Sequence, residues 1–121
     1  MIARDLSDLV GRTPLAEIPA AGRWPDGVRI LAKLEAHNPG GSVKDRPALS
    51  MVRAAERDGR LAGRELLDAS SGNTAIAIAM LAAARGIGAT LVMPAHVSAA
   101  RRRRVEAHGA RIVFTDPLEG T

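Results

Sequence analysis

Lys44 is the residue whose type and surroundings are best suited to covalent chemistry. It lies in the segment NPGGSVKDR, residues 38–46, where Ser42 followed three residues later by Asp45 is the capping-box pattern that opens a helix. Unpaired N–H groups give the first turn of a helix partial positive charge, so a neutral amine is favoured there over a cation. Schiff-base chemistry requires a neutral amine. By spacing alone, an ordinary surface lysine explains Lys44 equally well.

The rarity of lysine in this chain supports Lys44 as a candidate. Arginine supplies 15 of the 17 basic residues, and the two exceptions are Lys33 and Lys44. Arginine stays protonated and cannot act as an amine nucleophile, whereas lysine can. Lys33 shares the face of an expected strand with Glu35, and a surface ion pair is the simplest interpretation of those two residues.

A second candidate site is the segment SSGNT at residues 70–74, which follows an expected strand and precedes an expected helix. Backbone N–H groups at a helix start, together with hydroxyl groups and a glycine that allows close approach, form a binding site for a carboxylate or a phosphate. The alternative is that a serine or threonine merely caps the helix. Five consecutive small polar residues exceed what a cap needs, so anion binding is favoured.

Four consecutive arginines, Arg101–Arg104, together with a net charge of +4, raise the possibility of nucleic-acid binding. Consecutive helical residues point in different directions, so these arginines do not form one basic face. A solvated helix surface with Glu106 nearby is the better interpretation. Aromatic residues make up only 2% of the chain, too few for a base-stacking platform.

The composition narrows the class of protein further. The chain has 121 residues, of which 46% are hydrophobic and 25% charged, as expected of one soluble globular domain. No apolar run reaches the roughly 20 residues of a membrane span, and the N-terminus lacks the pattern of a secretory signal. With no cysteine, a disulfide scaffold and a thiolate metal site are excluded. We expect a cytoplasmic protein with no membrane partner. No metal site is expected, because metal-ligand spacing is lacking among the three histidines, His37, His96 and His108.

Strand and helix patterns alternate along the chain. Alternating or apolar runs predict strands at 15–18, 28–35, 65–69, 89–93 and 111–114, and helical patterns occupy 5–10, 43–57, 73–85 and 98–108. The helix at 73–85 is apolar almost all round, which predicts that it is buried. This alternation predicts an α/β fold with a parallel sheet and flanking helices.

Four motifs together resemble a known family. GRTPL at residues 11–15, KLE at 33–35, NPGGSVKDR at 38–46 and SGNT at 71–74 follow the order and spacing of the cysteine synthase/cystathionine β-synthase family of fold-type II pyridoxal-phosphate enzymes. The resemblance is nearest to the type B branch and covers essentially the whole chain. It implies a tryptophan synthase β-like fold. Members of the family are longer than this chain, so the resemblance also implies that the chain is the N-terminal portion of such an enzyme. The phosphate-binding cup and the residue that pairs with the pyridine nitrogen would then lie beyond Thr121.

The resemblance also implies a role for each matched residue. Lys44 matches the lysine that binds pyridoxal phosphate covalently and later moves the substrate α-proton. Asn73 matches the residue that hydrogen-bonds the ring oxygen of the cofactor. The residues that match the site for the carboxylate of the amino-acid substrate are Ser70, Ser71, Gly72, Asn73 and Thr74. Residues 1–41 would contribute the first strands to a larger cofactor domain, and residues 42–121 would form a smaller, mobile α/β domain.

The implied activity is synthesis of L-cysteine from an activated serine, O-acetylserine or O-phosphoserine, and a sulfur donor by β-replacement. The implied partners are these small molecules and, in the full-length enzyme, a second copy of the chain in a homodimer, with no nucleic acid. Two alternatives remain open. One is a related replacement or elimination enzyme, such as a cystathionine β-synthase or a serine/threonine dehydratase. The other is an inactive fragment that acts only as a binding module.

Overall fold

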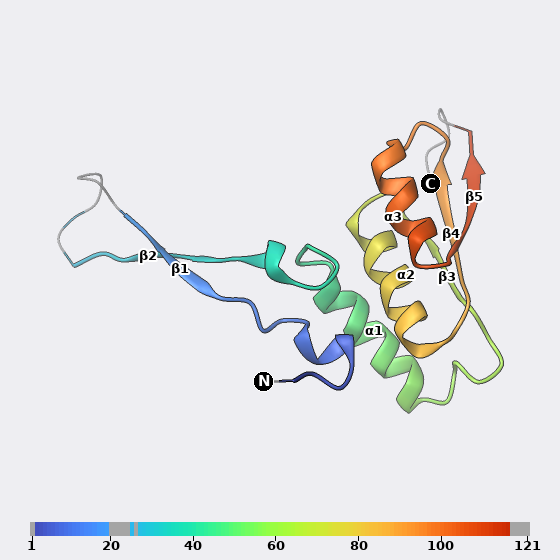
Figure 1. Ribbon diagram of the computed structural model, residues 1–121, viewed down its shortest axis with the longest axis horizontal. Coiled ribbons are helices and arrows are strands. Elements are labelled where there is room, and N and C mark those ends of the chain that lie inside the picture. Colours follow the sequence, from blue (N-terminus) through green and yellow to red (C-terminus); the bar gives the residue numbers. More distant parts are fainter. Residues whose placement is uncertain (1, 20–24, 26, 117–121) are drawn as a thin grey trace.

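The computed structural model describes residues 2–19, 25 and 27–116 of the chain. Its elements, shown in Figure 1, are the 3-10 helix η1 (Leu6–Leu9), strands β1 (Leu15–Ile18) and β2 (Ile30–Lys33), the 3-10 helix η2 (Glu35–His37), helix α1 (Asp45–Arg57), strand β3 (Leu66–Ala69), helix α2 (Asn73–Arg85), strand β4 (Ala89–Pro94), helix α3 (Ala99–Ala107) and strand β5 (Arg111–Thr115). The predicted elements all lie within two residues of these bounds, and the structure adds η2, which was not predicted.

Strands β3, β4 and β5 form a parallel sheet with β4 in the centre. Parallel neighbours require a crossover connection, which α2 provides between β3 and β4 and α3 provides between β4 and β5. Helix α2 packs between α1 and α3 and against both β3 and β4. Figure 1 shows the three helices on the same side of this sheet. The predicted α/β fold with a parallel sheet and flanking helices is confirmed.

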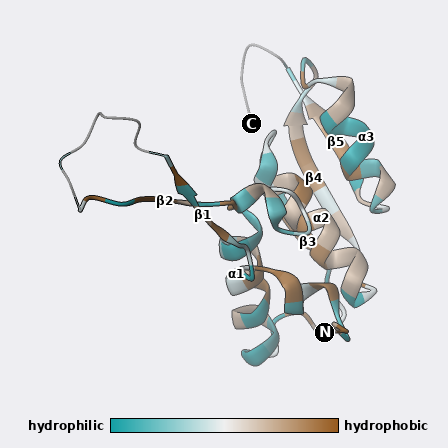
Figure 2. Ribbon diagram, turned by 60° about the vertical axis from the view of Figure 1, so that its left-hand side comes forward, coloured by the Kyte–Doolittle hydropathy of each residue, from teal (hydrophilic) through white to brown (hydrophobic). Residues whose placement is uncertain are grey.

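Helix α2 forms the centre of the hydrophobic core. Eight consecutive residues, from Ala75 to Ala82, are buried, and Ile76, Met80 and Leu81 are at most 1% exposed. Figure 2 shows the hydrophilic colour concentrated on α3 and on parts of α1, whereas α2 is mostly pale to brown. The small alanines let α1 and α3 approach α2 closely, so a core almost without aromatic rings is still well packed. The predicted burial of this helix is confirmed.

The first two strands form a separate antiparallel hairpin. Strand β1 pairs with β2 and neither joins the three-stranded sheet. Figure 1 shows the hairpin projecting away from the rest of the molecule. Strand β2 is shorter than predicted because Glu35 begins η2, closed by hydrogen bonds from the His37 N–H to the Leu34 carbonyl and from the Asn38 N–H to the Glu35 carbonyl.

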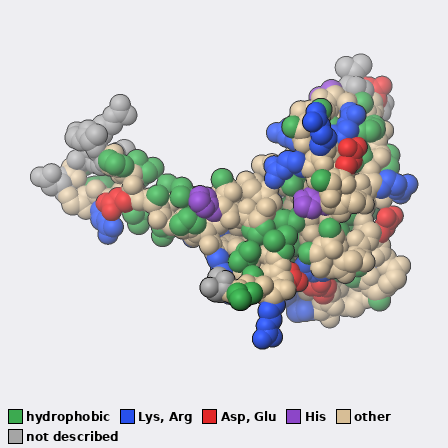
Figure 3. All heavy atoms as spheres, in the orientation of Figure 1, with side chains coloured by type: hydrophobic (Ala, Val, Ile, Leu, Met, Phe, Trp, Pro, Cys, Tyr) green, Lys and Arg blue, Asp and Glu red, His purple; other side chains and the backbone are tan. Residues whose placement is uncertain are grey.

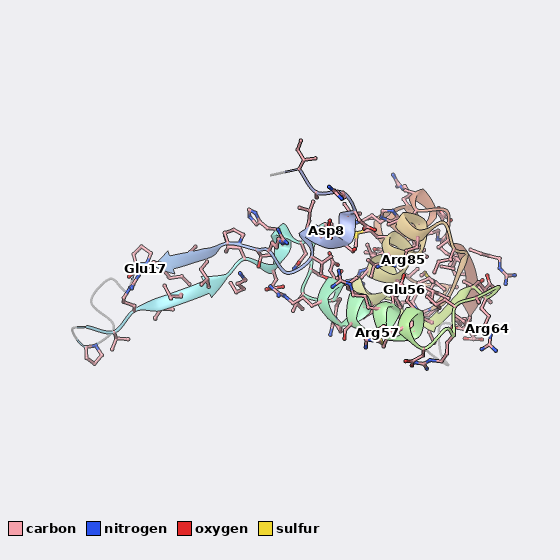
Figure 4. All side chains as sticks on the ribbon, turned by 90° about the horizontal axis from the view of Figure 1, so that it is seen from below. Asp8, Glu17, Glu56, Arg57, Arg64 and Arg85 are labelled. Carbon is pink, nitrogen blue, oxygen red and sulfur yellow. The ribbon has the colours of Figure 1, made fainter. Side chains whose placement is uncertain are left out.

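An ion pair joins the far ends of α1 and α2. Arg85 Nε lies 2.5 Å from Glu56 Oε1, and Figure 4 shows the two side chains between the helices. The Arg85 side chain is only 13% exposed, so this pair is better shielded from solvent than a typical surface pair. It thus links the last turns of the two helices.

Among the described residues, no helix is long and apolar enough to cross a bilayer.

Candidate active site

Lys44 lies at the residue before the first turn of α1, with an exposed side chain. Its backbone N–H donates to Ser42 Oγ at 3.1 Å. Its amine makes no hydrogen bond or ion pair with any described residue. By contrast, the amine of Lys33 donates to the Thr13 carbonyl. The structure therefore separates the two lysines of the chain, because one amine is engaged by the protein and the other is free.

The expected ion pair between Lys33 and Glu35 is wrong. Glu35 pairs with Arg46 instead, through Arg46 Nε to Oε2 at 2.9 Å and Nη2 to Oε1 at 2.8 Å. A guanidinium presents two parallel donors to a carboxylate, whereas an ammonium does not, so this pairing is preferred. Hydrogen bonding to Arg46, helped by Asn38, lowers the pKa of Glu35 to about 2.

The network around Glu35 binds the N-terminal segment to α1. Asn38 Nδ2 donates to Glu35 Oε2 at 2.8 Å, and the Gly11 N–H donates to Asn38 Oδ1 at 2.8 Å. Arg46 Nη2 also donates to the Gly11 carbonyl and to Thr13 Oγ1, each at 3.2 Å. Asn38 and Thr13 are buried, so these polar groups replace lost water contacts with protein partners.

The capping-box prediction at the start of α1 is wrong in its geometry. Ser42 Oγ accepts the N–H of Lys44, not that of Asp45, and Asp45 Oδ2 accepts the N–H of Gly40, not that of Ser42. The reason is that Asp45 points into the protein, where it is 0% exposed. Burial raises the pKa of Asp45, and its Oδ1 has no hydrogen-bond partner in the described part of the chain. A Cβ on Gly40 would lie 2.4 Å from that oxygen, so glycine is required there.

The predicted anion-binding segment forms the turn between β3 and α2. The Ser70 N–H donates to the Val92 carbonyl at 3.0 Å and so extends the pairing of β3 with β4. The Gly72 N–H reaches Ser70 Oγ at 3.5 Å, which is a weak contact. The side chains of Ser71, Asn73 and Thr74 have no hydrogen-bond partner among the described residues. Several polar groups therefore gather in one turn without binding the protein itself.

No side chain caps the N-terminus of α2, where Gly72 is the capping residue. A Cβ built on Gly72 would meet no atom within 4 Å, so the space before the helix is open. Where a serine does cap a helix in this chain, the bond is visible, because Ser98 Oγ accepts the N–H of Arg101 at the start of α3. Plain capping by a serine or threonine therefore does not describe the start of α2, whose first N–H groups have no side-chain partner among the described residues.

The starts of α1 and α2 lie toward the same end of the α/β unit. Figure 1 shows both helices running in the same general direction, opposite to the strands. Ligands of open parallel sheets bind beyond the carboxyl ends of the strands, which is where the turn after β3 lies.

Two hollows lie away from this turn. An apolar one of about 200 Å³ lies between α1 and β3, and a basic one of about 350 Å³ lies between α1 and Gly11.

The four arginines of α3 were predicted to point in different directions, and they do not form one basic face in the structure. Figure 3 shows basic side chains over the region of α3. The guanidinium of Arg102 lies 4.5 Å from the centre of the Phe114 ring, and Nη2 of Arg104 donates to the Gly40 carbonyl at 2.8 Å. The side chains of Arg101 and Arg103 are exposed and make no hydrogen bond or ion pair with the described residues.

The contacts made by Arg46 and Arg104 were not predicted from the sequence. The pairing of Arg46 left a trace in the sequence, because Glu35 is the one acidic residue between Gly27 and Lys44 and Arg46 is a basic residue close to it in the chain. For Arg104 no local signal exists, since its partner is a backbone carbonyl 64 residues earlier in the chain.

Comparisons with known proteins show which family the chain resembles. The family model described as pyridoxal-phosphate dependent enzyme matches residues 6–121. The chain is 52% identical over 116 residues to the cysteine synthase of Aquifex aeolicus, covering 93% of this chain and 36% of that protein. It is 44% identical over 117 residues to cysteine synthase B of Salmonella typhimurium, covering 95% of this chain and 38% of that protein. The crystal structure of a cysteine synthase from Entamoeba histolytica superposes with a TM-score of 0.93 at 37% identity, covering 99% of this chain and 37% of that one. The chain thus spans little more than a third of these relatives.

The low pKa of Glu35 predicts a loss of stability in acid. A carboxylate whose folded pKa lies near 2, below its ordinary 4.5, contributes stability that is fully present above pH 4.5 and is lost as the pH falls toward 2. In the full-length protein, melting temperatures measured across this range should fall for the native sequence and change less for Glu35→Gln. Glu17→Gln, which breaks the exposed pair with Arg29, serves as the control. Equal pH profiles for the native enzyme and Glu35→Gln would contradict this.

The contact between Gly40 and Asp45 predicts that Gly40→Ala is strongly destabilising. The added methyl group must displace a buried carboxylate, which costs on the order of 1–3 kcal/mol, as for other overpacked sites. Gly72→Ala is the matched control, because its methyl group enters open space and costs under about 1 kcal/mol as a poorer capping residue. Denaturant unfolding of the full-length protein measures both free-energy losses. Equal losses would show that the Gly40 contact does not matter.

Proposed function

This chain belongs to the family of pyridoxal-phosphate dependent enzymes, and on that premise we propose that the complete enzyme to which it contributes is a cysteine synthase. It would make L-cysteine from O-acetylserine or O-phosphoserine, with the sulfur of a donor replacing the acetate or phosphate at the β-carbon. The names of the relatives at 44 and 52% identity support this activity. The observation in the structure that carries it is the free amine of Lys44, in contrast to the engaged amine of Lys33.

The residues present fit the cofactor of the family. When bound, pyridoxal phosphate supplies a conjugated ring that accepts the electron pair left at the substrate α-carbon. Lys44 would hold the cofactor through its amine, remove the proton from the α-carbon and return it after the replacement. Asn73, whose side chain has no protein partner among the described residues, would donate a hydrogen bond to the ring oxygen.

The turn at 70–74 would bind the carboxylate of the amino-acid substrate. The uncapped N–H groups of α2 and the partial positive charge of the helix start favour a negative group there. The free hydroxyls of Ser71 and Thr74 add two donors, and Gly72 leaves room for close approach. Ser70, the residue after β3, anchors this turn to β4 through the hydrogen bond from its N–H to the Val92 carbonyl. The sulfur donor would then reach the β-carbon while the carboxylate is held.

The same resemblance supports further expectations for the complete enzyme. Residues 1–41 would join a larger cofactor domain, residues 42–121 would form a smaller mobile domain, and two copies would form a homodimer in the cytoplasm. The separation of the β1–β2 hairpin from the three-stranded sheet fits that division, although η1 in the first segment packs against α2.

The first test concerns Lys44. Borohydride reduction of the complete enzyme with bound pyridoxal phosphate, followed by peptide mass mapping, should place the pyridoxyl group on Lys44. Lys44→Ala and Lys44→Arg should each lower kcat by about 10²- to 10⁴-fold, the contribution of a positioned acid–base group, since arginine offers no neutral amine. Turnover is measured with O-acetylserine or O-phosphoserine and sulfide, as cysteine formed together with released acetate or phosphate.

Lys33→Ala is the matched control for this test, and it should keep both the adduct and the turnover. An adduct on Lys33 would overturn the assignment of the lysine. An adduct on Lys44 without cysteine formation, but with turnover of a larger thiol or with elimination, would favour a related β-replacement or elimination enzyme.

The second test concerns the turn at 70–74. Ser71→Ala and Asn73→Ala should weaken the binding of substrate or cofactor and leave the melting temperature unchanged, because neither side chain has a protein partner to lose. Ser98→Ala removes a real helix cap in α3, so it should cost about 1 kcal/mol of stability and leave turnover intact. If the variants at 71 and 73 behave like Ser98→Ala, the turn is only a cap.

A further inference from the structure

Arg104 reaches from α3 to the glycine turn that precedes Lys44. Its Nη2 donates a hydrogen bond of 2.8 Å to the Gly40 carbonyl. The contact also constrains Gly41, because a Cβ there would lie 3.3 Å from the same Nη2 and the backbone has a φ of +81°, which favours glycine. The turn that leads into α1 is therefore shaped around a side chain from α3.

The peptide groups of Gly40 are held from two directions. The N–H of Gly40 donates to Asp45 Oδ2, inside the protein, and its carbonyl accepts from Arg104. Asp45 is fully buried, and its second oxygen lacks a hydrogen-bond partner in the described part of the chain. Hydrogen bonds and nearby positive charge both favour the ionised form of a buried carboxylate. Burial raises the pKa of Asp45, and the hydrogen bond from the Gly40 N–H and then the charge of Arg104 oppose that rise.

We propose that Arg104 is a positioning residue for Lys44, acting through the Gly40 peptide and the carboxylate of Asp45. Lys44 is the residue directly before Asp45, so the anchoring of Asp45 sets the backbone from which the Lys44 side chain extends. Covalent chemistry at an amine requires the reacting atoms to lie about 3–3.5 Å apart and in line. A turn held at only one of its two ends would let Lys44 sample positions outside that range. This proposal rests on the function proposed above.

Two other features of α3 make the proposal specific. The guanidinium of Arg102 is engaged with Phe114 and with the Ala95 carbonyl, so it is unable to replace Arg104. Arg103 is the adjacent residue, equally charged and exposed, and its side chain has no described partner. Arg103→Ala is therefore a control with the same change of charge, helix and solvent exposure.

The experiment uses the complete enzyme after removal and re-addition of pyridoxal phosphate. Two quantities are measured: the rate at which the cofactor becomes trapped on Lys44 by borohydride, and amide hydrogen exchange of residues 38–46 in the cofactor-free protein. Arg104→Ala should slow the trapping by about 10- to 100-fold, the loss expected when a reacting group shifts by roughly 1 Å, and should speed the exchange. Arg103→Ala should change neither, and Arg104→Lys, which keeps the charge and one donor, should fall in between.

Arg104→Ala that matches Arg103→Ala in both measurements would overturn the proposal. Amide hydrogen exchange of residues 73–85 in α2 reports whether a variant is folded. If Arg104→Ala is not folded by this measure, the comparison of Arg104→Lys with Arg103→Lys tests the proposal instead. If the native enzyme traps no cofactor on Lys44, the proposed function fails, and the exchange of residues 38–46 still decides whether Arg104 holds the turn.

Discussion

The ion pair between Glu35 and Arg46 is the interaction on which the candidate site depends. Its two hydrogen bonds of 2.9 and 2.8 Å join η2 to the first turn of α1, and the same guanidinium holds the Gly11 carbonyl and the Thr13 hydroxyl. A planar fork fixes direction as well as distance, which a point charge does not. The N-terminal segment, whose strands belong to a separate sheet, is thereby attached to the helix that carries Lys44.

Three consecutive residues at this helix start serve three purposes because successive helical side chains point about 100° apart. Lys44 faces solvent with a free amine, Asp45 enters the interior, and Arg46 turns to the N-terminal segment. Two glycines make room for the side chains of Asp45 and Arg46. A Cβ on Gly40 would lie 2.4 Å from Asp45, and one on Gly11 would lie 2.8 Å from Arg46. Gly11 and Gly40, one from each of the two N-terminal motifs, are thus explained by side chains of α1.

Much of the fold could be predicted because it depends on local patterns. The apolar run at 73–85 and the glycine after it define α2 to the residue, and Gly86 ends the helix with a φ of +65°. Partners distant in the sequence could not be predicted. The preference of Glu35 for Arg46 over Lys33 depends on where α1 lies, and the reach of Arg104 to Gly40 depends on how α3 packs. Residue type and spacing suggested residues 44 and 70–74 as candidates, but they gave no indication of the contacts around the turn that precedes Lys44.

The imbalance between arginine and lysine acquires a physical explanation in the structure. Arginines at 29, 46 and 85 make ion pairs in which the fork of the guanidinium meets a carboxylate, and two of these are bidentate. Such pairs need several donors in fixed directions and no change of protonation. An amine is required only where a proton must be lost or a covalent bond formed. In a chain whose ion pairs among the described residues all use arginine, a lysine with no described partner beside a glycine turn is therefore a stronger indication of chemistry than the same lysine would be in a lysine-rich surface.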